Sequence, residues 1–171
     1  MNRRHFLQAS AVAAAATGHS EGAAAALTAP GGLEVVRGVI TSWRRKDLDG
    51  MLSYVDDDIV WHSHVGSPPI IGKAAMREFA TKLTAQMDDI RWRIFSAAPD
   101  GDSLHVEGVD DYVAVADRRR LVLPYAGIFV FRAGRITEWR DYFDRALFDR
   151  LKAGEALPAY LEPLVNRAAL F

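Results

Sequence analysis

The longest apolar stretches of the chain lie in its last third and predict a β-hairpin. Apolar residues run almost unbroken through residues 121–131, and the side chains of residues 135–144 alternate between two faces, as they do on a strand. The short segment from Arg132 to Arg135 contains a glycine, which tight turns favour because glycine adopts positive φ without strain. We therefore expect two long antiparallel strands joined by a turn.

One face of the second predicted strand carries Trp139, Asp141 and Phe143, each two residues from the next. A carboxylate that is flanked by two aromatic side chains is costly to bury unless another group pairs with it or a reaction uses it. Asp141 is therefore the first candidate for chemistry.

Helical and strand periodicities predict the remaining elements. The expected helices cover residues 33–43, 48–55, 72–87, 146–152 and 157–170, and Pro158 and Pro163 interrupt the last of them. The further strands cover residues 59–65, 90–97 and 103–116. Helices first and a curved antiparallel or mixed sheet afterwards is an α+β pattern. A sheet that curves around one long helix makes a cone, whose interior suits a small lipophilic substrate or ligand. The C-terminal helices are expected to cap the cone or to join a homodimer contact.

The first residues are typical of an export signal. Arg3 and Arg4 precede a short, weakly apolar, alanine-rich segment, which resembles the twin-arginine signal. We expect the twin-arginine export machinery as a partner and a periplasmic or secreted location. The expected organisation is a signal peptide at 1–26, a linker at 27–32, one domain at 33–148 and a C-terminal helical extension at 149–171.

Composition narrows the function classes. Half of the 171 residues are apolar, which suits one domain with a substantial core. The 21 basic and 22 acidic side chains nearly cancel, so the charge balance gives no sign of nucleic-acid binding. There is no cysteine, which excludes disulfides, thiolate metal sites and cysteine nucleophiles. Beyond the N-terminus no apolar run reaches the roughly 18 residues of a membrane span.

A second carboxylate lies on another predicted strand. On residues 103–116, Asp110 shares a face with Gly108 and Tyr112, and this face is apolar near its middle. If this face and that of Asp141 line the same cone, the pKa of one carboxyl is raised, so that one acid accepts a proton while the other donates one. That arrangement is what general acid–base opening of a strained or polarised oxygen compound needs.

Several motifs carry a resemblance to known families. The order of elements resembles the nuclear-transport-factor-2-like, or SnoaL-like, cone fold. Residues 123–129 read LPYAGIF, residues 134–136 read GRI and residues 139–144 read WRDYFD, which look like the limonene-1,2-epoxide hydrolase family. WRDYFD is the more specific motif, and the similarity covers residues 33–148.

The resemblance implies a cofactor-free epoxide hydrolase with no metal. In that family an Asp that matches Asp141 deprotonates a water molecule, which attacks an epoxide carbon. A second Asp, which matches Asp110, protonates the departing oxygen. An Arg two residues before the second Asp bridges both acids, and this chain has Gly108 at that position. Without that cation both carboxyl pKa values should rise.

The family's water-binding Tyr and Asn also differ here. The Tyr position falls on Trp61, whose indole donates a hydrogen bond but cannot accept one. The Asn position falls on Ser63 or, with a shift of one residue, on His64, and either side chain can bind water. His62 and His64 are expected to share a strand face, but the spacing of the sequence offers no third metal ligand.

Two other functions stay open. A SnoaL-like isomerase or cyclase moves protons with a single pocket Asp, here Asp141, and a non-catalytic protein of this shape binds a small lipophilic molecule. The catalytic candidates are Asp110 and Asp141. The candidates for substrate or water binding are Trp61, Ser63, His64, Tyr112, Trp139 and Phe143.

Overall fold

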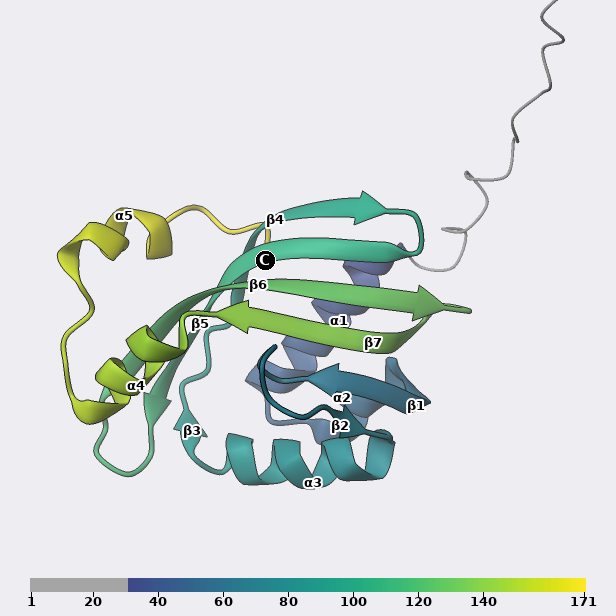
Figure 1. Ribbon diagram of the computed structural model, residues 1–171, viewed down its shortest axis with the longest axis horizontal. Coiled ribbons are helices and arrows are strands. Elements are labelled where there is room, and N and C mark those ends of the chain that lie inside the picture. Colours follow the sequence, from purple (N-terminus) through teal and green to yellow (C-terminus); the bar gives the residue numbers. More distant parts are fainter. Residues whose placement is uncertain (1–30) are drawn as a thin grey trace, which may run out of the picture.

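The computed structural model describes residues 31–171 and shows an α+β cone, in which a curved sheet wraps around the N-terminal helices (Figure 1). The predicted signal peptide at 1–26 lies outside the described residues. The helices are α1 (Gly32–Arg44), α2 (Leu48–Ser53), α3 (Lys73–Thr84), α4 (Arg145–Ala153) and α5 (Glu162–Val165), with a 3-10 helix η1 (Ala159–Leu161). The strands are β1 (Val55–His62), β2 (Ile70–Ile71), β3 (Met87–Asp88), β4 (Arg93–Asp100), β5 (Ser103–Ala114), β6 (Arg120–Arg132) and β7 (Arg135–Phe143).

The sheet is mixed. Its strands follow the order β2-β1-β7-β6-β5-β3, and β4 also pairs with β5. The predicted meander of β4 to β7 is antiparallel throughout, whereas β1 runs parallel to β7. This parallel pair sets Trp61 beside Trp139, and the antiparallel β6–β7 pair sets Gly127 beside Asp141. The WRDYFD motif of residues 139–144 therefore begins on β7, a central strand of the sheet with β1 on one side and β6 on the other.

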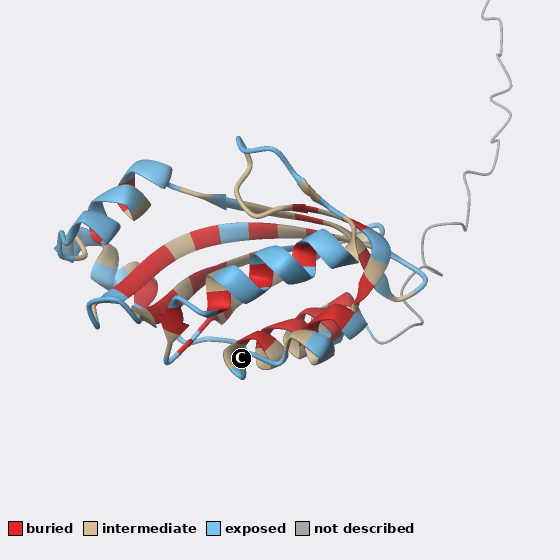
Figure 2. Cartoon of the chain, turned by 90° about the horizontal axis from the view of Figure 1, so that it is seen from below, coloured by how far each residue is buried: buried red, intermediate tan, exposed pale blue. Residues whose placement is uncertain are grey.

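Helix α1 provides the inner wall of the cone. Its buried side chains include Val36, Val39, Ile40 and Trp43, whose spacing places them on one face of a helix. Figure 2 shows buried residues gathered between the helices and the concave side of the sheet, with exposed residues on the outer helix faces. Burial of this stripe fixes α1 against the sheet and leaves room beside it for a cavity.

Several predicted boundaries in the first half are wrong. The predicted helix 72–87 ends at Thr84, and Met87 begins the short strand β3. The predicted helix 48–55 ends at Ser53, and the strand expected from residue 59 begins at Val55. The cause is the acidic run at residues 56–58, which has the composition of a turn but lies within β1. There Asp57 forms a 2.6 Å ion pair with Lys73. A register shift between Val55 and Val60 breaks the alternation that would have revealed the strand.

The predicted helix 157–170 is also wrong, since only η1 and α5 form within it. The last residues are extended instead: the backbone N–H of Leu170 donates to the Ile94 carbonyl at 2.7 Å, and the N–H of Ile94 donates to the Phe171 carbonyl at 3.2 Å. The backbone groups at the end of the chain thus pair with β4 rather than with a further helical turn.

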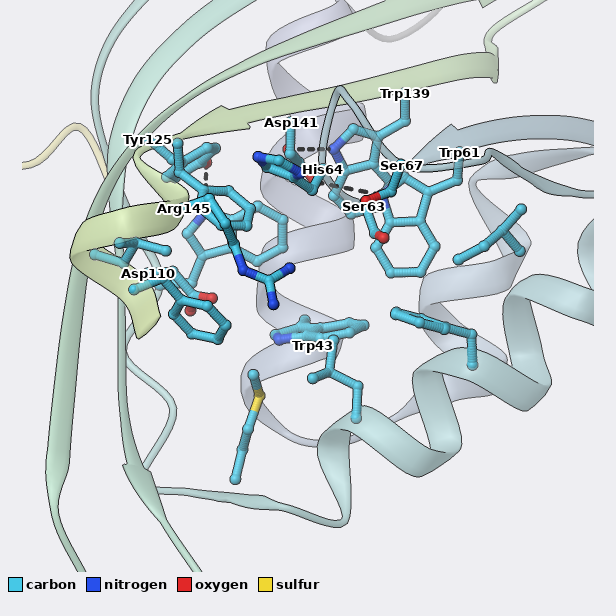
Figure 3. A pocket seen from close by; sticks show the side chains of 18 of the residues that line it. Trp43, Trp61, Ser63, His64, Ser67, Asp110, Tyr125, Trp139, Asp141 and Arg145 are labelled. Atoms are coloured by element: carbon cyan, nitrogen blue, oxygen red, sulfur yellow. Dashed lines mark hydrogen bonds between the residues drawn. The ribbon is translucent and has the colours of Figure 1, made fainter. Parts of the chain in front are cut away.

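The C-terminal extension covers two parts of the cone. Helix α4 follows β7 directly and lies beside the cavity described below (Figures 1 and 3). Further along, Leu157 and Val165 pack with Val109, Val122 and Phe95 on the opposite face of the sheet. The expected homodimer contact stays a prediction.

Candidate active site

A cavity of about 360 Å³ opens between α1, α3, α4 and the concave face of the sheet (Figure 3). Both candidate catalytic acids and all six candidate binding residues line it. The lining residues are Trp43, Trp61, Ser63, His64, Ser67, Pro68, Ile70, Phe79, Leu83, Met87, Trp92, Asp110, Tyr112, Leu123, Tyr125, Trp139, Asp141, Phe143, Arg145 and Phe148. Most of them are aromatic or aliphatic, so a small lipophilic molecule would gain free energy by moving from water into the cavity.

Asp141 is held by two indole groups. The Nε1–H of Trp139 donates to Oδ1 at 2.8 Å, and the Nε1–H of Trp61 donates to Oδ2 at 3.3 Å (Figure 3). The strand pairing that sets Trp61 beside Trp139 brings both donors to the same carboxylate. Burial raises the pKa of Asp141 to about 7, and the two indole bonds oppose that rise. Asp141 is thus oriented and changes charge near neutral pH.

Asp110 faces the same cavity from β5. Burial, followed by the charge of Asp111, raises the pKa of Asp110 to about 7. Its Oδ1 atom is buried and has no hydrogen-bond partner among residues 31–171. A buried, unsatisfied carboxyl oxygen is costly, so this atom is available to a molecule that enters the cavity.

Burial is the main reason that both carboxyls hold protons so readily. The charge of Asp110 raises the pKa of Asp141, but it is the weakest of the causes. The pairing of the two acids predicted that the pKa of one carboxyl is raised, whereas the pKa values of both are raised, and burial is the largest cause for each. The rise of both pKa values agrees with the prediction for a site that lacks the bridging Arg.

Gly108 leaves no space for a side chain. A Cβ at this position would lie 2.3 Å from the Arg93 carbonyl oxygen and 3.0 Å from Cε1 of Tyr125. Gly108 pairs with Tyr125 across the β5–β6 ladder, and the Tyr125 ring lies where the family's Arg side chain would begin. The backbone of Arg93 and the ring of Tyr125 thus leave no room for an Arg side chain at this position.

Tyr125 is a cavity residue that sequence reasoning missed. The Nε1–H of Trp92 donates to its hydroxyl oxygen, and the hydroxyl itself donates no hydrogen bond to residues 31–171. Burial and the charges of Asp141 and Asp110 raise the pKa of Tyr125 well above its usual value. The hydroxyl therefore stays protonated and can donate a hydrogen bond into the cavity. The sequence places Tyr125 in the motif LPYAGIF, but this apolar run has no alternation of polar and apolar residues from which its inward-facing side chains could be predicted.

The loop after β1 forms part of the cavity rim. Val65 N–H donates to the Asp141 carbonyl at 2.9 Å, which ties this loop to β7. The His64 ring lies 4.6 Å from the Phe143 ring, and Nδ1 of His64 is buried without a partner within residues 31–171. Strand β1 ends at His62, so the expected common strand face for His62 and His64 is wrong, and His62 is absent from the lining.

The fold and the site define a cone-shaped α+β protein with an acidic, aromatic cavity. Residues 36–139, more than half of the chain, match the SnoaL-like domain, and the chain belongs to this family. Its fold is thus that of the SnoaL-like, or nuclear-transport-factor-2-like, proteins, as the sequence motifs predicted.

Three solved structures show the same fold. A nuclear-transport-factor-2-like protein of unknown function from Burkholderia pseudomallei is 23% identical over 70% of this chain and 95% of its own, with a TM-score of 0.63. An LEH-like epoxide hydrolase from M. tuberculosis is 25% identical over 71% of this chain and 89% of its own, with a TM-score of 0.61. A putative polyketide cyclase from Xanthomonas campestris pv. campestris is 23% identical over 68% of this chain and 92% of its own, with a TM-score of 0.58.

The N-terminus carries an export signal. Residues 1–18 match the twin-arginine translocation pathway signal sequence, so the chain is directed to the twin-arginine machinery and exported to the periplasm or beyond. Within residues 31–171 no helix has the length and apolar character needed to cross a membrane.

Proposed function

We propose that the protein is a cofactor-free enzyme that hydrolyses an epoxide-type lipophilic substrate with Asp141 as general base and Asp110 as general acid. The observation that carries the proposal is that two carboxyls with pKa values of about 7 line one apolar cavity. Near neutral pH each acid is present in both protonation states, which suits one to take a proton and the other to give one.

The reaction balances with these two groups and one water molecule. Ionised Asp141 takes a proton from water while the water oxygen forms a bond to an epoxide carbon. The carbon–oxygen bond of the ring breaks, and the departing oxygen receives the proton of Asp110. The product is a diol, and a proton returns from Asp141 to Asp110 through solvent. Activity needs ionised Asp141 and protonated Asp110, so it should peak near pH 7 and fall on both sides.

Other lining residues support these steps. Ser63 and His64 stand at the positions that match the family's water-binding Asn, and both line the cavity. Trp61 and Trp139 orient the base, because both of its oxygens accept an indole hydrogen bond. Tyr112 and Phe143 complete the surface that would hold the hydrocarbon part of the substrate. Fixed orientation of the base lowers the entropic cost of reaching the transition state.

A second candidate is an isomerase or cyclase that acts on a carbon acid, and two observations favour it. The indole of Trp61 donates to Asp141 and has no second polar atom with which to hold water. The hydroxyl of Tyr125 is a free donor that could bind a carbonyl oxygen while Asp141 removes a proton from the neighbouring carbon. This reaction needs neither a bound water nor the bridging Arg.

Isotope labelling separates the candidates. The purified protein is incubated with a panel of epoxides in ¹⁸O water, and the Asp141→Asn variant serves as the isosteric control. A labelled diol that forms with the wild type and not with the variant supports hydrolysis. A parallel incubation uses a panel of ketones in deuterated water. Deuterium exchange beside the ketone carbonyl, without diol from the epoxides, supports the isomerase. Ligand binding that survives in the Asp110→Asn and Asp141→Asn double variant, with no turnover of either substrate type, overturns both and identifies a carrier.

A further inference from the structure

The rim of the cavity carries a single cationic side chain. Arg145 is the only lysine or arginine among the residues that line the cavity in the described part of the chain. It is the first residue of α4, and Figure 3 shows its guanidinium extending from that helix across the cavity. The side chain is 58% exposed, so it remains accessible to a ligand that arrives from solvent.

Helix stability does not explain an arginine at this position. Asp144 caps α4 by accepting a hydrogen bond from the Leu147 N–H at 3.0 Å, as helix N-termini favour. A cation at the next residue faces the positive end of the helix dipole, where cations are disfavoured. The Arg145–Asp149 ion pair also has the less favourable order for an i,i+4 pair, in which the acidic residue should come first.

The hydrogen bonds of Arg145 leave one edge of the guanidinium open. Its Nε–H is shared between the two carboxylate oxygens of Asp149, at 2.9 and 3.1 Å. The two terminal nitrogens of the guanidinium make no hydrogen bond to residues 31–171. Two parallel N–H groups on a planar fork match the two oxygens of a carboxylate. Asp149 therefore holds the fork in place without occupying its binding edge.

One aromatic ring lies beside the Arg145 guanidinium, and a second ring packs against the first. The guanidinium carbon lies 5.8 Å from the centre of the Phe148 ring, and the Phe148 ring meets the Phe143 ring edge-on at 5.7 Å. Both phenylalanines line the cavity. A ligand bound here would place a charged group on Arg145 and a flat or compact apolar body against these rings.

We propose that Arg145 binds an ionised carboxylate of the substrate, so that the protein selects amphipathic acids, whose apolar body fills the cavity and whose carboxylate lies at the rim. This inference names the substrate class of the proposed enzyme and rests on the same cavity being its active site. Asp110 and Asp141 face the body of such a molecule, so the acid group that anchors the substrate is separate from the groups that would react.

Isothermal titration calorimetry tests the proposal without measuring turnover. The probes are 2-naphthoate and 2-naphthamide, which share one ring system and differ in charge. The wild type should bind the naphthoate about tenfold more tightly, since a hydrogen bond between two charged groups is stronger than one to a neutral amide. Arg145→Gln should remove this preference and leave the affinity for the amide unchanged. The matched control is Arg150→Gln, which changes another arginine of α4 that pairs with Glu155 and does not line the cavity.

Three outcomes overturn the proposal: equal affinity of the wild type for the two probes, a preference that persists in Arg145→Gln, or no binding of either probe at millimolar concentration. The Asp141→Asn variant separates this proposal from the proposed reaction. If that variant loses turnover but keeps the preference for naphthoate, both proposals stand. If naphthoate binding depends on Arg145 but no epoxide or carbon acid reacts, the substrate class stands and the reaction is wrong.

Discussion

The indole N–H of Trp61 donates a hydrogen bond to Oδ2 of Asp141 across the parallel β1–β7 pair, at 3.3 Å. In the limonene-1,2-epoxide hydrolase family the position that matches Trp61 holds a tyrosine that helps to bind water. Here the side chain binds the base itself. The consequence is a carboxylate whose two oxygens are both fixed, inside a cavity whose apolar walls favour its neutral form.

Replacing Trp61 should move the pH dependence of activity. The Trp61→Phe substitution removes a hydrogen bond that stabilises ionised Asp141, so the pKa of Asp141 should rise by roughly 1 unit. Because the base must be ionised, the acid limb of the pH profile of kcat/KM should shift to higher pH by the same amount. Trp43→Phe is the matched control, since Trp43 lines the cavity but makes no hydrogen bond to Asp141. An acid limb that stays in place in Trp61→Phe contradicts the role of Asp141 as base.

Asp110 should destabilise the fold above neutral pH. Its pKa is about 7 when folded against the usual 3.8, so the folded state binds more protons between these values. Stability therefore falls as the pH rises from about 4 to 7 and levels off above that range. The Asp110→Asn variant has no carboxyl to ionise at this position, so its stability does not fall in this way. The unfolding free energy of the variant minus that of the wild type should therefore be larger at pH 8 than at pH 5, by on the order of 1–3 kcal/mol.

Urea unfolding at the two pH values measures this difference. Asp58→Asn is the control, because Asp58 is an exposed carboxylate of β1 outside the cavity. It should change the unfolding free energy by similar small amounts at both pH values. Equal effects of Asp110→Asn at pH 5 and pH 8 would show that the Asp110 carboxyl is better solvated than its burial implies.

Much of the fold could be predicted from the sequence because alternation and helical spacing are local. The strand 135–144 displayed its inward face directly, which placed Asp141 between Trp139 and Phe143 in the cavity. The parallel β1–β7 pairing could not be predicted in the same way, because it joins distant residues: Trp61 and its partner Trp139 are 78 positions apart, and the Trp61–Asp141 hydrogen bond spans 80. The end of the chain was mispredicted because its pairing with β4 competes with a helix.

The site was predicted in part for a related reason. Acidic residues on apolar strand faces are unusual, so Asp110 and Asp141 could be identified as candidates from their positions in the sequence alone. Tyr125 lies in an apolar run without alternation, and its role depends on Trp92, which belongs to another segment of the chain. Arg145 lies between the predicted strand 135–144 and the predicted helix 146–152, and its place at the cavity depends on how α4 packs. The roles of Tyr125 and Arg145 therefore depend on packing between segments that are distant in the sequence.

Gly108 should resist every substitution, including the Arg that the resemblance to the limonene-1,2-epoxide hydrolase family implies at this position. A Cβ at this position would meet the backbone oxygen of Arg93 at 2.3 Å, and backbone cannot move aside as a flexible side chain can. Gly108→Ala should therefore lower the unfolding free energy by about 1–3 kcal/mol, and Gly108→Arg by more. Thermal unfolding measures both. Gly31→Ala is the control, because a Cβ there meets nothing within 4 Å. A stable Gly108→Arg variant would show that the strand can open to admit the bridging cation.

Tyr125 offers the sharpest separation between the two proposed reactions. If its hydroxyl stabilises a carbonyl oxygen that gains charge, Tyr125→Phe should lower kcat by about 10²–10³ with little change in KM. If the substrate is an epoxide whose oxygen is protonated by Asp110, the same substitution should lower kcat by less than about tenfold. Tyr125→Phe also leaves the buried Trp92 N–H without its acceptor, at a cost of about 1–3 kcal/mol in unfolding free energy.

The Trp92→Phe variant controls for that structural cost. It breaks the same hydrogen bond but keeps the Tyr125 hydroxyl in the cavity, so any loss of kcat that it shares with Tyr125→Phe comes from packing. Loss confined to Tyr125→Phe comes from the hydroxyl itself. A large fall in kcat for Tyr125→Phe alone, measured on a carbon acid by proton exchange, supports the isomerase. Unchanged exchange in both variants rules out Tyr125 as the donor to a developing oxyanion, because a free hydroxyl beside that oxygen could not be removed without effect.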